Sequence, residues 1–250
     1  MIALLDVEIR RILARRLVRM VALLLAAGYL IRALFLLASD DPFAYVDLTD
    51  WLEGTGGFAI VIAWVIGASF IGAEWQRGTM TTLLTWEPRR VRVVAAKVAA
   101  CALVVGATAL ALQAFLALVL LPAGLDGSMA GTDAEWLREA SGIWLRAGMG
   151  AAIFGVLAFA VAEIGRSTGA ALGAGFAYFA VAENFIRAWK PEWMPWLLGD
   201  NIVVLITGQG EDAAVELAGR STVEAGVILL FYAGVAFGVA TFLFQRRDVT

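Results

Sequence analysis

The sequence predicts an all-α, polytopic integral membrane protein with six transmembrane helices. Of its 250 residues, 61% are apolar and 16% are charged, whereas soluble domains average about 45–50% apolar and 25% charged residues. Six apolar runs approach the roughly 20 residues that cross a bilayer core of about 30 Å. Because lipid offers backbone groups no hydrogen-bond partners, runs that cross must be helical.

The expected spans belong to one transmembrane domain, residues 1–250. They cover residues 17–38, 57–73, 98–121, 143–162, 168–188 and 225–244. An even number of spans places both termini on the same side of the membrane. That side carries thirteen of the nineteen Lys and Arg residues and six of the 22 acids. Since cytoplasmic loops are enriched in Lys and Arg, we expect a cell-membrane protein with both termini in the cytoplasm.

The first sixteen residues predict an amphipathic helix. Its apolar side chains recur every three or four positions, at Ile2, Leu5, Ile9, Ile12 and Leu13. Such a helix lies along the inner membrane surface; the alternative is a basic flank that only fixes topology. Because acids interrupt this region and sixteen residues precede the apolar run, we expect the first span to be retained rather than cleaved as a signal peptide.

Three connections are expected on the outer side. Residues 39–56 are acidic and lack basic residues, which is typical of a solvated loop, and residues 122–142 form a connection of similar size. The longest connection, 189–222, begins with three tryptophans and two prolines before an apolar stretch. Two hypotheses remain open there: a short or re-entrant helix over 197–206, or an ordinary aromatic belt at the headgroups.

Glycines recur at four-residue spacing in the last two spans. They are Gly165, Gly169 and Gly173 in the fifth span and Gly234 and Gly238 in the sixth. Small residues let helices approach closely in lipid. We expect packing within one subunit, and a subunit interface is the alternative.

The inner connection 74–97 concentrates polar and basic residues between two apolar runs. Thr79 can cap a helix that Pro88 ends, which predicts about two turns of cytoplasmic helix. An apolar ridge on this helix is expected to be exposed to a partner, and it consists of Met80, Leu83 and Leu84. Glu74 and Arg77, three residues apart, are expected to pair. Four basic residues are expected at the inner headgroups: Arg89, Arg90, Arg92 and Lys97. The alternative is a loop that only carries positive charge.

The order of residues from Gly72 to Lys97 reads G-x-E-x-x-x-G-T-x-x-x-L-L-x-x-x-P-x-R-x-x-x-x-x-x-K. This pattern resembles the signature that follows the second span in ABC exporter permeases of the six-span type, and the ending Gln245-Arg246-Arg247-Asp248 is similar to that family's C-terminal end. The resemblance implies a coupling helix in the cleft of a cytoplasmic ATPase, two ATPase subunits, and a second permease that is either a copy or a homologue. The implied coupling residues are Glu74, Arg77, Gly78, Thr79, Met80, Leu83, Leu84, Glu87 and Pro88.

The chain lacks the usual groups of an enzyme site. It has no histidine and a single cysteine, Cys101, so we expect no catalytic site, cofactor or metal. A phosphate-binding loop needs a lysine between Gly and Ser or Thr, and neither Lys97 nor Lys190 has these neighbours. ATP hydrolysis is therefore expected on a separate chain; the other expected partners are membrane lipids and no nucleic acid.

Charged residues within the spans need partners, because insertion scales assign about 2.5–3.5 kcal/mol to a charge at the bilayer centre. Glu183 and Arg187 are one helical turn apart and are expected to pair. Arg32 is near enough to the outer end to extend to the headgroups or to meet an outer carboxylate. The alternative is that these three side chains line a polar translocation path.

The favoured function is therefore the permease subunit of an ABC exporter. An ion-coupled secondary transporter would need titratable groups near the membrane midplane. An intramembrane enzyme lacks evident catalytic pairs, and a non-transporting membrane scaffold for an ATPase remains open. The substrate is not specified by the sequence.

Overall fold

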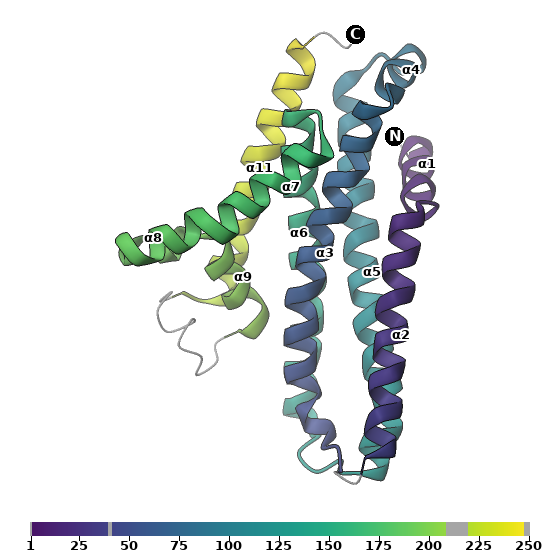
Figure 1. Ribbon diagram of the computed structural model, residues 1–250, viewed down its shortest axis with the longest axis vertical. Helices are drawn as coiled ribbons and strands as arrows, with labels where there is room; N and C mark the ends of the chain where they lie inside the picture. Colours follow the sequence, from purple (N-terminus) through teal and green to yellow (C-terminus); the bar gives the residue numbers. More distant parts are fainter. Residues whose placement is uncertain (1, 40–41, 209–219, 248–250) are drawn as a thin grey trace.

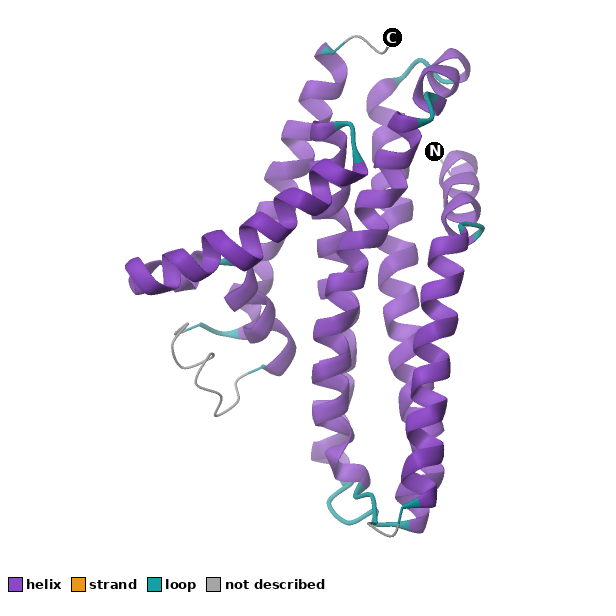
Figure 2. Ribbon diagram, in the orientation of Figure 1, coloured by secondary structure: helices purple, strands orange, loops and turns teal. Residues whose placement is uncertain are grey.

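The computed structural model describes residues 2–39, 42–208 and 220–247, which form helices joined by short turns without a β-strand (Figure 2). Six helical segments in these ranges are long and apolar enough to cross a membrane, which confirms the predicted all-helical fold with six candidate spans. They are Arg16–Ala38, Tyr45–Gln76, Arg90–Asp126, Ala134–Gly165, Thr168–Trp189 and Thr222–Arg246.

The N-terminal segment is a helix, α1 (Ile2–Leu13), which is separated by a break at Ala14 and Arg15 from α2 (Arg16–Ala38). The apolar face of α1 is partly buried against the helix bundle and partly exposed. Ile12 is fully buried and Ile9 packs against the core, whereas Ile2 is exposed. The predicted amphipathic helix therefore exists, and part of its apolar face contacts α5 rather than facing outward.

Three helices are longer than predicted: α3 (Leu48–Gln76), α5 (Arg90–Asp126) and α6 (Ala134–Gly165). They absorb much of the connections 39–56 and 122–142, which the sequence predicted as loops. Acidic residues at helix N-termini favour this extension: Asp50 lies in the first turn of α3, and Asp133 accepts hydrogen bonds from two backbone N–H groups of α6. At 1.5 Å per residue, the 37 residues of α5 measure about 55 Å.

Glycines bring α3 close to its neighbours. A Cβ atom added at Gly67 would lie 2.2 Å from the carbonyl oxygen of Gly155 on α6, and one at Gly72 would lie 2.3 Å from the backbone nitrogen of Thr168. The glycines singled out in the last two spans behave differently. Gly173, Gly234 and Gly238 would meet no atom within 4 Å, so the prediction that they pack within one subunit is wrong.

The fifth span is a continuous helix with a π-helical stretch in its middle, and it slopes away from the bundle (Figure 1). It consists of α7 (Thr168–Phe176), the π-helical η2 (Ala177–Ala182) and α8 (Glu183–Trp189). The chain then returns through η3 (Pro191–Trp196) and α9 (Leu198–Thr207) to α11 (Thr222–Arg246). Leu205 of α9 packs beside Gly150 and Gly226, so α9 lies along the middle of α6 and not at its end.

Candidate functional site

The elements that the sequence places in the cytoplasm gather at one end of the molecule. Figure 1 shows α1, α4 (Thr79–Trp86) and the C-terminal end of α11 together at that end, where α4 joins the end of α3 to the start of α5. We call this region the α4 end.

The residues on either side of α4 determine where this helix begins and ends. Gly78 has φ = +66°, a left-handed conformation that glycine adopts without a Cβ clash. Glu87 is extended (φ −129°, ψ 94°) ahead of Pro88, as the residue before proline prefers. The predicted helix is therefore present with eight residues. Gly78 occupies the N-cap position, so Thr79 is the first residue of the helix and not its cap as predicted. The Thr79 hydroxyl instead donates a hydrogen bond to the Glu74 carbonyl at 3.2 Å.

The predicted apolar ridge faces the bundle rather than a partner. Met80 is fully buried, and Leu83 is partly buried against the core; the side chain of Leu84 lies outside the described part of the structure. The prediction of an exposed ridge is wrong for Met80, because packing against the helix bundle removes it from solvent. The apolar side chain that α4 does expose is Trp86, at 85%. Sequence reasoning missed Trp86, although a tryptophan two residues before Pro88, at a helix end, was the available signal.

The basic residues after α4 have separate roles. Arg89 is exposed, and Arg92 forms an ion pair with Glu87 at 3.5 Å. Arg90 donates hydrogen bonds to the carbonyls of Phe244 and Arg247 at 2.9 and 2.8 Å. Cations favour the C-terminal ends of helices, where carbonyls lack partners. Arg90 therefore caps α11 and does not extend to the headgroups as predicted.

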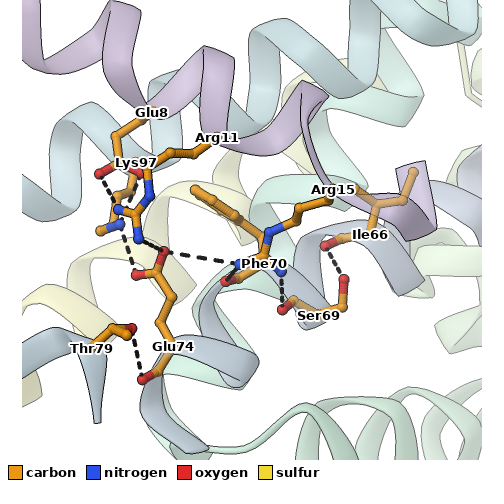
Figure 3. Close-up of polar contacts among 9 residues, drawn as sticks. All are labelled: Glu8, Arg11, Arg15, Ile66, Ser69, Phe70, Glu74, Thr79 and Lys97. Carbon is orange, nitrogen blue, oxygen red and sulfur yellow. Dashed lines mark hydrogen bonds and ion pairs between the residues drawn. The ribbon is translucent and has the colours of Figure 1, made fainter. Parts of the chain in front are cut away.

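Lys97 is the centre of an ionic cluster that consists of Glu8, Arg11, Arg15, Glu74 and Lys97 (Figure 3). Glu8, Glu74 and Lys97 are buried, whereas the Arg11 side chain is 40% exposed. The Lys97 side chain has no exposed surface. Its ammonium nitrogen donates a hydrogen bond to Glu8 Oε2 at 2.9 Å and forms an ion pair with Glu74 Oε2 at 2.8 Å. The prediction that Lys97 lies at the headgroups is wrong, because α5 directs it toward two carboxylates on α1 and α3.

Two arginines complete the cluster. Arg11 donates a hydrogen bond to Glu8 Oε1 at 2.9 Å and lies 3.2 Å from Glu74 Oε1. Arg15 donates to the carbonyls of Ser69 and Phe70, each at 2.8 Å, and lies 4.0 Å from Glu74 Oε1. Burial lowers the pKa of the Arg15 guanidinium, and the Glu74 carboxylate opposes this shift.

The cluster joins α1, α3 and α5 around a shared aromatic ring. The Lys97 nitrogen is 5.2 Å from the centroid of the Phe70 ring, and the Arg15 guanidinium is 4.9 Å from it. Glu74 therefore pairs with Lys97 and Arg11, whereas the predicted partner Arg77 is exposed at the surface. Each carboxylate faces a cation, so the arrangement is suited to holding helices together. No group of three or more potential metal ligands occurs among the described residues.

A second polar cluster lies where α8 meets α9. Arg187 Nη2 is 3.2 Å from Glu183 Oε2 and 2.7 Å from Asp200 Oδ1, which confirms the predicted Glu183–Arg187 pair. The other Glu183 oxygen accepts a hydrogen bond from the backbone N–H of Gly199 at 2.7 Å. Asp200 was missed by sequence reasoning; an acid near the start of an apolar segment was the available signal.

Arg32 has aromatic rather than acidic neighbours. Its guanidinium lies 4.7 Å from the ring centroid of Trp51 and 5.6 Å from that of Phe35. Within the described ranges no ion pair joins Arg32 to an outer carboxylate, and its Nε has no hydrogen-bond partner there. The rings accept the cation through their negative faces.

We expect Glu183→Gln to destabilise the protein less than Asp200→Asn. Asp200 holds Arg187 through three contacts of 2.7–3.4 Å, whereas Glu183 makes one at 3.2 Å. Losing a hydrogen bond to a charged group costs about 1.5–3 kcal/mol, so both variants should unfold at lower temperature in a thermal scan in micelles. Equal melting temperatures, or the reverse order, would show that Asp200 is not the main partner of Arg187.

Comparison with protein-family models finds no match, and comparison with curated proteins finds no similar sequence. A functional proposal therefore depends on the geometry of the α4 end and on the residue pattern of the segment 72–97.

Proposed function

We propose that this chain is the membrane-spanning permease subunit of an ATP-driven ABC exporter, with α4 as the coupling helix that binds a separate cytoplasmic ATPase. The observation that carries the proposal is the geometry of α4: Met80 anchors the helix in the bundle while Trp86 is 85% exposed beside it. A helix held from one side and exposed on the other is suited to a groove on a partner.

The exposed surface of α4 has the composition of a docking site. Thr82, Thr85 and Arg89 are exposed near Trp86 in the sequence, and Arg77 is exposed ahead of the start of α4. Tryptophan and arginine dominate binding hot spots. The matching partner surface has a pocket for the indole and an acidic rim for the two guanidinium groups.

The charge distribution supports a cytoplasmic location for the α4 end. The basic residues of α1, of the α4 region and of the end of α11 lie together there (Figure 1). Acidic residues mark the first turns of α3 and α6 at the opposite end. Under the positive-inside rule, both termini and α4 are cytoplasmic in the cell membrane.

The faces left open by this chain support a second permease subunit. Large apolar side chains are exposed on the fifth span and on α11, namely Phe176, Val181, Phe185, Val227 and Phe231. Gly173, Gly234 and Gly238 face open space on these same two segments. In lipid, small residues mark surfaces where another helix approaches closely, so a copy or a homologue of this chain is suited to this face, with lipid covering the rest.

An ion-coupled secondary transporter is the second candidate, and one observation favours it. Glu183, Arg187 and Asp200 meet where the π-helical η2 passes into α8 and where α9 begins. Charged groups within spans often mark ion pathways in transporters. Arg187 pairs with both carboxylates, which leaves less capacity for a coupled ion.

The test is to purify the tagged chain from its native membranes, identify the bound proteins, and reconstitute the complex in vesicles. We expect a copurifying ATPase with a phosphate-binding loop, and ATP hydrolysis that changes when this chain is present. Transport into the vesicles that persists without ATP and stops when the proton gradient is removed would instead support the secondary transporter. A bound ATPase with no transport would support a scaffold.

A further inference from the structure

The ionic cluster at the α4 end joins two carboxylates to the same two cations. On the α1 side, Glu8 accepts a hydrogen bond from Lys97 and another from Arg11, both at 2.9 Å. On the α3 side, Lys97 and Arg11 lie 2.8 and 3.2 Å from the two carboxylate oxygens of Glu74. Lys97 is therefore within charge-assisted hydrogen-bond distance of both carboxylates.

Glu74 also has a choice of cations. Lys97, Arg11 and Arg15 all lie within 4.0 Å of its two oxygens. An exchange among these three partners would keep the carboxylate paired throughout. A buried carboxylate with three neighbouring cations can thus shift without exposing an unpaired charge, which would be strongly unfavourable.

The same residue is linked directly to α4. The Glu74 carbonyl accepts the hydrogen bond from the Thr79 hydroxyl, and only a short turn that contains Gly78 at φ = +66° separates the two residues. A displacement of α4 therefore acts first on the end of α3 that carries Glu74. The α1 helix is held through Glu8 to Lys97 on α5, which is the helix that follows α4 in the chain.

Stability alone gives little reason for such a cluster, because well-packed neutral residues often replace a buried ion pair without loss. We propose that Lys97 is a positioning residue in a charge-held joint: the Glu8–Lys97 bond fixes α1 on α5, while Glu74 exchanges among Lys97, Arg11 and Arg15 as the corner between α3 and α4 moves. This inference rests on the proposed function for the source of that motion, an ATPase bound to α4. The joint itself is a property of this chain.

The test measures distances in the chain alone, in lipid nanodiscs, so that it does not depend on a partner. In a Cys101→Ala background, spin labels are placed at three exposed positions: Val7 on α1, Val91 on α5 and Thr85 on α4. Pulsed electron paramagnetic resonance then gives the Val7–Val91 and Val7–Thr85 distance distributions.

Three variants separate the two sides of the joint. We expect Glu8→Gln to broaden both distributions, because α1 loses its charged bond to α5. We expect Glu74→Gln to leave the Val7–Val91 distribution unchanged and to alter only Val7–Thr85. The neutral triple variant E8Q/E74Q/K97M should remain folded and broaden both. The control is E135Q/R138M, an exposed pair on α6, which should change neither.

Identical narrow distributions in the native protein and the folded triple variant would overturn the proposal, as would Glu74→Gln releasing α1 from α5. If the native protein binds no ATPase, the proposed function fails while the distances still decide whether the joint exists.

Discussion

We expect Lys97→Met to lower the free energy of unfolding by about 3–5 kcal/mol, the usual cost of removing one partner from a buried ion pair. Methionine fills a similar volume, so the loss comes mainly from charge. Glu8 and Glu74, at 1% and 3% exposure, would be left with Arg11 as their shared close partner. The measurement is equilibrium unfolding in mixed micelles, followed by tryptophan fluorescence.

The control for this variant is Arg138→Met, which removes one partner of an ion pair with side chains 79% and 80% exposed. Exposed pairs contribute about 0.2–1 kcal/mol, so this change should be small. Adding Glu8→Gln and Glu74→Gln to Lys97→Met should recover much of the loss, because no unpaired carboxylate then remains. If Lys97→Met is no more harmful than Arg138→Met, the cluster does not hold the three helices together.

The second large effect is expected at Trp86. Replacement with alanine should weaken binding of the proposed ATPase partner by at least about 30-fold, since hot-spot residues contribute about 2 kcal/mol or more and 1.4 kcal/mol corresponds to a tenfold change. The stability of the chain itself should change by no more than about 0.5 kcal/mol, as for other surface substitutions. A binding titration with the purified ATPase and a thermal scan measure the two quantities.

Trp193→Ala is the matched control, because it removes another exposed indole, 55% accessible, from the distant η3 segment. It should leave ATPase binding unchanged. Met80→Asp is unsuitable as a docking test, because Met80 is fully buried and an aspartate there would disturb folding. Equal affinities for the Trp86→Ala variant and the native chain would remove Trp86 from the docking surface.

Hydropathy located the spans well, because burial in lipid depends on local composition. The α2 helix begins at Arg16, one residue before the predicted start, and ends at the predicted Ala38. Helix ends were less predictable. Polar residues such as Asp50 were predicted to lie in a loop, yet they stabilise the first turn of α3. Pro122 was predicted to begin a connection, yet α5 continues past it to Asp126.

The candidate site was predictable in position and not in orientation. Spacing placed a two-turn helix before Pro88, but which face of it is exposed depends on packing against the rest of the bundle, and so Trp86 was missed while Met80 was misplaced. Lys97 was predicted to lie at the headgroups because it follows Arg89, Arg90 and Arg92 and directly precedes the third predicted span. Its partner Glu8 is 89 residues away, a separation at which one sequence gives no signal of contact.

That separation has a consequence for biosynthesis. At about 5–20 residues per second, the ribosome adds Lys97 roughly 4–18 seconds after Glu8, since the two are 89 positions apart. During this interval the first helix must enter the membrane while Glu8 still lacks the lysine that will neutralise it. The N-terminal helix can therefore reach its final place against α5 only after the third candidate span has been made.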